Sequence, residues 1–281
     1  MLIRIGFEIA LDFAQRTPTL LMLNVHPSRR HDLVVPDRLH IEPATAMTSH
    51  LDPFGNLCSR LTAVPGLLRV ATDAVIADSG EPDRVASGSR SVPIEELPSE
   101  TLPFLLGSRY CETDLLSQTA WALFGGTLPG GPCVQAIVDY VHRHLEFGYP
   151  HARVTRSAAE AFDERRGVCR DFAHLAIAFC RCMNIPARYA TGYLGDIGVP
   201  RDPAPMDFSA WFEAYLEGGW FSFDARHNRP RIGRIVMAYG RDAADVALAN
   251  SFGRHELAQF DVFTDELADG RTVRRPPRRP E

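Results

Sequence analysis

The sequence predicts an α+β fold, in which a β-sandwich-like N-terminal domain precedes a core made of a central helix packed on an antiparallel sheet. Short apolar runs punctuated by Pro and Gly fill residues 1–85, a pattern typical of a β-sandwich. One helical segment, at about 168–183, is apolar on most sides and is therefore expected at the centre of a domain. Three strand-like segments follow it between residues 188 and 224. This order is typical of a core in which a central helix delivers its first residue to the edge of a sheet.

Composition limits the class of protein. The chain has 281 residues, 45% of them hydrophobic, and a net charge of −5. These values suit two modest globular domains and give no reason to expect a nucleic-acid partner. No apolar run approaches the length of a membrane span, and the charges of Arg4 and Glu8 do not fit a signal peptide. We therefore expect a cytoplasmic protein without a membrane partner, and its oligomeric state stays open.

The N-terminal region contains strand and turn signals. Residues 4–9 alternate polar and apolar side chains, 20–25 and 67–76 are apolar runs, and 52–56 have the composition of a turn. We expect four parts: a β-rich domain at 1–85, a linker at 86–103 within a stretch rich in Pro, Ser, Gly and acidic residues, a core at 104–265, and a flexible Arg- and Pro-rich tail at 266–281.

The core begins with helices. Residues 134–142 repeat apolar side chains with a helical period, and Ser157 opens a capping-box pattern that starts a second helix. The central helix at about 168–183 ends before Pro186, because the residue preceding a proline avoids helical angles. Strands are expected at 188–193, 208–216 and 220–224, the last two joined by a hairpin turn at 217–218.

Cys169 is the candidate nucleophile. It follows Gly167 at the expected first turn of the central helix, where the positive end of the helix dipole stabilises a thiolate over a thiol. The thiolate is the nucleophilic form of cysteine, and the flanking Arg170 favours it further. The alternative is a buried structural thiol, because free cysteine is common in protein cores.

The other five cysteines are expected to be structural thiols. Disulfides are disfavoured in a long chain without a secretion signal. Cys180 and Cys182 lie near His174, but a zinc site needs about two to four residues between paired cysteines and a second ligand pair, which this sequence lacks. We therefore expect no metal.

Three motifs point to one family. They are Arg-Gly-Val-Cys-Arg-Asp-Phe-Ala at 166–173, Asn-Ile-Pro-Ala-Arg-Tyr at 184–189 and Gly-Tyr at 192–193. They resemble the transglutaminase-like superfamily, and most closely its bacterial branch described as cysteine proteases. The resemblance covers about residues 103–250, with a weaker match to the β-rich domain that precedes the core in that branch.

The resemblance implies a triad and a reaction. In the family the triad is a Cys, a His just before an Ala-Trp pair, and an Asp at the end of the next strand, which correspond here to Cys169, Ser209 and Asp224. The Cys169 sulfur would attack an amide carbonyl and form a thioester, which water or an amine then releases. Hydrolysis of peptide or isopeptide bonds is favoured over cross-linking because this branch resembles proteases. The implied partner is a peptide or protein substrate, without a metal or organic cofactor.

The expected hairpin supports the position of Asp224 and raises the question of Ser209. The turn at 217–218 sets residue 224 across from about residue 211 and diagonal to Ser209, a separation of about 7–8 Å. Ser209 forms hydrogen bonds but does not accept a proton from a thiol near neutral pH. Three explanations stay open: a binding protein on an enzyme fold, another histidine as the base, or a cysteine ionised by its surroundings alone.

Two histidines are alternatives to the absent imidazole. His227 is a candidate base or substrate contact, because a turn at 228–230 would bring it back toward Asp224. His174 is a poor candidate, since it lies about 140° around the helix from Cys169.

The remaining side chains give the site its candidate walls. Trp211 and Tyr215 share the strand face of Ser209, and they either wall a substrate cleft or pack in the core. Two classes of function follow. The first is a transglutaminase-like thiol enzyme that acts on amide or peptide bonds. The alternative is a non-catalytic peptide- or protein-binding protein of the same fold, disabled by Ser209; a docking partner of another enzyme is a third, weaker class.

Overall fold

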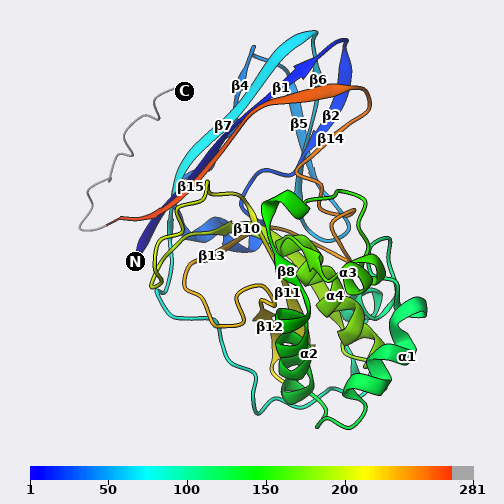
Figure 1. The fold of residues 1–281 in the computed structure, drawn as a ribbon. Helices are drawn as coiled ribbons and strands as arrows, with labels where there is room; N and C mark the ends of the chain where they lie inside the picture. The colour runs from blue at the N-terminus through cyan, green and yellow to red at the C-terminus, as the bar shows by residue number, and fades with distance from the viewer. Residues whose placement is uncertain (268–281) are drawn as a thin grey trace.

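The computed structural model describes residues 1–267 (Figure 1). Two antiparallel sheets form a β domain at one end of the molecule, and the α-helices with a further sheet form the core at the other. This arrangement confirms the predicted α+β class, with a sandwich-like domain ahead of a helix-on-sheet core.

The two sheets of the β domain share one apolar core. The first sheet has the order β15-β1-β7-β3, with β4 also paired to β7, and the second has the order β14-β2-β6-β5. Buried side chains from both sheets, such as Phe7 and Leu61, meet between them, as the alternation along each strand dictates. The strands are β1 (Leu2–Phe13), β2 (Thr17–Leu21), β3 (Leu33–Val35), β4 (His40–Glu42), β5 (Met47–Leu51), β6 (Leu57–Ala63), β7 (Gly66–Ala77), β14 (Ala249–Ser251) and β15 (His255–Glu266).

The C-terminal strands belong to the β domain rather than to the core. β15 pairs antiparallel with β1 from Ile3 opposite Glu266 onward, and β14 pairs with β2. The expectation of a core that continues to residue 265 is therefore wrong. The reason is that an unpaired edge of β1 exposes backbone donors and acceptors, and a strand from far along the chain satisfies them. The predicted tail at 266–281 starts inside this strand, and its residues 268–281 lie outside the described part of the chain.

The core has a papain-like layout, in which α4 packs across a sheet of order β12-β11-β10-β13. Ala210, Phe212 and Ala214 of β11 lie in one apolar cluster with Phe172 and Phe179 of α4. The alternating small side chains let the helix approach the strand closely. The core elements are α1 (Thr113–Phe124), α2 (Gly131–His144), β8 (Glu146–Phe147), η4 (Tyr149–His151), α3 (Ala158–Glu164), β9 (Arg166–Gly167), α4 (Cys169–Cys182), β10 (Ala187–Leu194), β11 (Ser209–Leu216), β12 (Gly219–Phe223) and β13 (Arg234–Gly240).

The segment between the two domains is attached to the core. The predicted linker at 86–103 holds the short 3-10 helix η2 (Ile94–Glu96) and most of η3 (Ser99–Leu105), while η1 (Pro27–Asp32) lies in the β domain. Ala86 is buried, and the Gly131 N–H donates to Ser89 O at 2.8 Å. The connection is therefore a packed strap rather than a loose tether.

Candidate active site

Cys169 is the first residue of α4, as the sequence predicts. The Asp171 carboxylate accepts a hydrogen bond from the Val168 N–H at 2.9 Å and so caps the helix end that carries the thiol. The buried Arg156 guanidinium donates to the same Asp171 oxygen at 3.1 Å and compensates its charge. Asp171 therefore has a structural role. Gly167 is required here, because a Cβ at this position would lie 2.6 Å from the Asp171 Cβ.

The surroundings of Cys169 keep it protonated at rest. It is half-buried, whereas the other five cysteines are buried, and all six are free thiols. Burial raises the pKa of the Cys169 thiol to about 11, although the Arg226 guanidinium and the Ala210 backbone amide oppose this rise. Asp207 and Asp224 raise the pKa further. Of the three explanations that the sequence leaves open, this raised pKa disfavours a cysteine ionised by its surroundings alone, and it indicates that the sulfur needs a base.

Asp224 follows the last residue of β12. The pairing of Phe212 with Phe223 confirms the predicted hairpin register, which continues to residue 224 opposite residue 211. The carboxylate is buried and accepts three hydrogen bonds, from the His227 backbone N–H at 3.0 Å, His227 Nδ1 at 2.8 Å and Arg234 Nη2 at 3.1 Å. Burial alone would raise the pKa of Asp224, but Arg234 and His227 outweigh burial and hold the pKa well below its usual value. Asp224 is thus a permanent anion.

The turn after Asp224 brings His227 back to it, as the sequence-based interpretation of residues 228–230 expects. The Asn228 N–H donates to Asp224 O at 2.8 Å, and Asn228 adopts a left-handed φ of 47°. Its side chain is tied to α2 through Gln135 and Asp139. Because a carboxylate only accepts hydrogen bonds, His227 carries its proton on Nδ1, which leaves Nε2 as the proton acceptor.

Ser209 and His227 line the same small polar pocket. Ser209 begins β11 and precedes Ala210, whose amide faces the Cys169 sulfur. Within residues 1–267, no hydrogen bond joins that sulfur to an imidazole. The pocket lining consists of Tyr149, Leu194, Asp196, Asp202, Ala204, Pro205, Met206, Asp207, Ser209, Arg226, His227 and Arg231. The structure therefore places an imidazole beside the position where the family has its histidine.

The other candidate residues lie apart from this pocket. His174 is buried, and its Nε2 accepts a hydrogen bond from the Ala243 N–H at 3.1 Å, so it is a structural residue. Burial holds the pKa of His174 well below its usual value, with Arg170 and Arg181 adding to the effect.

Trp211 and Tyr215 do not line the pocket of Ser209 and His227. The Trp211 side chain is buried against Ala190 and Val236, and the Tyr215 ring contacts the Trp220 ring edge-on, with centroids 5.2 Å apart. The structure thus favours packing over a wall of this pocket for both side chains.

Arg226 is a site residue that the sequence analysis missed. Its guanidinium lies over the Phe147 ring at 3.7 Å, lines the pocket and lowers the pKa of Cys169. The only sequence signal for it was its position between Asp224 and His227. Tyr149, from a separate 3-10 turn, completes the same side of the pocket and had no local signal.

Comparison with known proteins identifies the family. A model of the transglutaminase-like superfamily matches residues 122–225, which include Cys169, Ser209 and Asp224 but end before His227. An uncharacterized protein of Mycobacterium bovis is 30% identical over 256 residues, which cover 82% of this chain and 81% of that protein. An uncharacterized protein of Mycobacterium leprae is 36% identical over 140 residues, which cover 47% of this chain and 48% of that protein.

The fold comparison extends to both domains. A crystal structure from Cytophaga hutchinsonii, described as a "Putative Cysteine Protease", is 30% identical, has a TM-score of 0.82, and covers 97% of this chain and 92% of that chain. The chain belongs to the transglutaminase-like superfamily.

The helices of the described residues do not have the length and apolar character needed to cross a lipid bilayer.

Proposed function

We propose that this chain is a thiol enzyme that cleaves amide or peptide bonds, with Cys169 as the nucleophile and His227 as the base. The observation that carries the proposal is the 2.8 Å hydrogen bond between His227 Nδ1 and the Asp224 carboxylate, in the pocket that also contains Ser209. An imidazole oriented by a carboxylate is the arrangement that activates a nucleophile in hydrolases.

The proposed reaction uses His227 as base and then as acid. His227 Nε2 takes the Cys169 proton as the sulfur bonds to the carbonyl carbon, and the carbonyl oxygen becomes an oxyanion. When this intermediate collapses, the C–N bond breaks, the amine leaves with the proton from Nε2, and a thioester remains. Water then attacks the thioester, transfers a proton to Nε2, and releases a carboxylic acid; the proton returns to the sulfur.

The charges around the sulfur fit this sequence of steps. With a thiol pKa of about 11, the thiolate forms only when a base takes the proton. The guanidinium of Arg226 then favours the thiolate, because it is the side chain that most lowers that pKa. Asp224 stabilises the imidazolium that appears at the same time.

The substrate class and the compartment are part of this proposal. The branch resemblance and the protease neighbour support a peptide or protein substrate, with hydrolysis favoured over amine transfer. Six free thiols support a reducing compartment, which we take to be the cytoplasm.

The second candidate function is peptide or protein binding without catalysis. Ser209 at the family histidine position and the raised pKa of Cys169 favour it. A substrate segment would then occupy the cleft without being cleaved.

Hydrolysis of a fluorogenic peptide library distinguishes the two functions. For the enzyme, we expect Cys169→Ala to abolish cleavage and His227→Gln to lower kcat about 100-fold or more, the usual size of a general-base contribution. His255→Gln is the matched control, because this exposed histidine lies on β15 in the β domain. If the wild type is inactive but Ser209→His creates cleavage that needs Cys169, the binding function is the correct one.

A further inference from the structure

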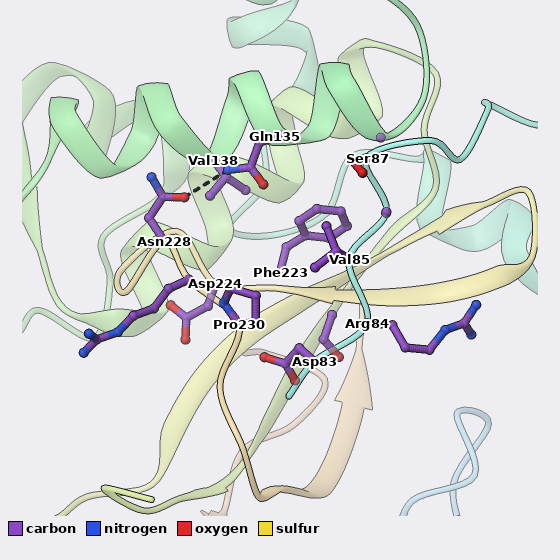
Figure 2. A pocket seen from close by; sticks show the side chains of 14 residues that line it. Asp83, Arg84, Val85, Ser87, Gln135, Val138, Phe223, Asp224, Asn228 and Pro230 are labelled. Atoms are coloured by element: carbon purple, nitrogen blue, oxygen red, sulfur yellow. Dashed lines mark hydrogen bonds between the residues drawn. The ribbon is translucent and has the colours of Figure 1, made fainter. Parts of the chain in front are cut away.

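The segment that leads from β7 into the strap, residues 78–85, reaches the candidate active site. The Asp83 N–H donates to Arg231 O at 2.9 Å, and the Arg231 N–H donates to Asp83 Oδ2 at 2.8 Å. This pair of bonds fixes that segment against the loop that follows the His227 turn. Figure 2 shows Asp83 and Asp224 beside Pro230, in a pocket that all three residues line. Asp83 is thus part of the surroundings of Asp224, although the two residues lie far apart in the sequence.

 Asp83 follows β7 of the β domain, whereas Asp224 follows β12 of the core.

Arg234 joins these two carboxylates. Its Nε donates to Asp83 Oδ2 at 2.8 Å, and its Nη2 donates to Asp224 Oδ2 at 3.1 Å. The three side chains are 13%, 6% and 2% exposed for Asp83, Arg234 and Asp224, so water screens their interactions poorly. Asp224 Oδ2, which accepts this hydrogen bond from Arg234, also accepts the hydrogen bond from His227 Nδ1.

We propose that Asp83 is a positioning residue, which holds Arg234 so that Asp224 stays available to orient His227; this inference rests on the proposed function of His227 as the base. Asp83 does not touch the reacting atoms and acts through two other side chains.

The geometry of the guanidinium gives the physical reason. Nε and Nη2 form the edge with which arginine binds a single carboxylate through two parallel hydrogen bonds. In this structure Arg234 Nε donates its hydrogen bond to Asp83, so Arg234 gives Asp224 only one hydrogen bond from that edge. Without Asp83, the whole edge is free to turn toward Asp224, where it competes with His227 Nδ1 for the same oxygen. His227 would then lose its fixed orientation and its single tautomer.

The test reads the tautomer of His227 by NMR on the full chain with ¹⁵N-labelled histidine. The His227 signals are assigned by their loss in His227→Gln. In the wild type we expect a proton on Nδ1 and a bare Nε2, and in Asp83→Asn we expect a mixture of both tautomers. Asp83→Glu keeps the charge and restores the wild-type spectrum. Asp73→Asn is the matched control, because Asp73 on β7 pairs with Arg4 on β1, within the β domain and outside the Arg234 network.

If the wild type cleaves a peptide substrate, its kinetics supply the second measurement. We expect Asp83→Asn to lower kcat about tenfold with KM little changed, and Asp73→Asn to leave both unchanged. If Asp83→Asn does not fold, Asp83→Ser replaces it, because this smaller polar side chain also removes the carboxylate that binds Arg234 Nε. A single Nδ1–H tautomer in the folded variant overturns the positioning role of Asp83. An inactive wild type with the expected tautomer change overturns the proposed function alone.

Discussion

Alkylation of Cys169 as a function of pH gives the most direct test of the displaced base. A thiol with a pKa of about 11 is ionised in roughly one molecule in 10,000 at pH 7, compared with about one in 100 for an ordinary thiol of pKa 9.0. If nothing takes its proton, Cys169 should react about 100-fold more slowly than an exposed cysteine, and its rate should rise about tenfold per pH unit between pH 7 and 10. This is the profile we expect for His227→Gln.

The wild type should differ at neutral pH if His227 accepts the proton. We expect iodoacetamide to label Cys169 at least ten times faster in the wild type than in His227→Gln at pH 7, and the two rates to converge at high pH. Mass spectrometry of the digested protein measures both rates. Cys111 is the internal reference in the same sample, because burial raises its pKa to about 12. Superimposable wild-type and variant profiles would refute the role of His227 as base.

Two further predictions concern the structure that supports the site. Asp224→Asn should lower the free energy of unfolding at pH 7 by about 1–3 kcal/mol, measured by urea denaturation, because it removes one of the two carboxylates that compensate the buried Arg234 guanidinium. The folded pKa of Asp224 is depressed, so the stability that its charge contributes is present above about pH 4 and is lost as the pH falls below that value. The free energy of unfolding should therefore fall more steeply below about pH 4 in the wild type than in Asp224→Asn. Gly167→Ala should destabilise the chain by about 1–3 kcal/mol in the same assay and lower activity, because the added Cβ collides with the capping Asp171; an unchanged urea midpoint would contradict this account of Gly167.

Local patterns predicted the elements that carry the site. The apolar periodicity of 168–183 predicted α4, and the alternation on either side of Glu217 and Gly218 predicted the β11–β12 hairpin with its register. The capping-box pattern at Ser157 predicted the start of α3. These predictions succeeded because each depends on residues only a few positions apart.

Contacts between distant segments were beyond this reasoning. The pairing of β15 with β1 joins the two ends of the described chain, and no local pattern specifies which edge a strand will complete. The raised pKa of Cys169 was not foreseen for a related reason, since the helix dipole is a local effect whereas desolvation depends on everything packed around the sulfur.

The sequence by itself determined that a cysteine begins a buried helix, that an acid ends the neighbouring hairpin, and that a serine stands where the family has its histidine. Those facts depend on short-range periodicity and on motifs. A turn that brings His227 back toward Asp224 was also expected, but only the tertiary structure decided that Arg234 links this pair to Asp83. Side chains from separate segments meet only when the chain packs, because hydrogen bonds and charge compensation in a buried site depend on distance in space rather than along the sequence.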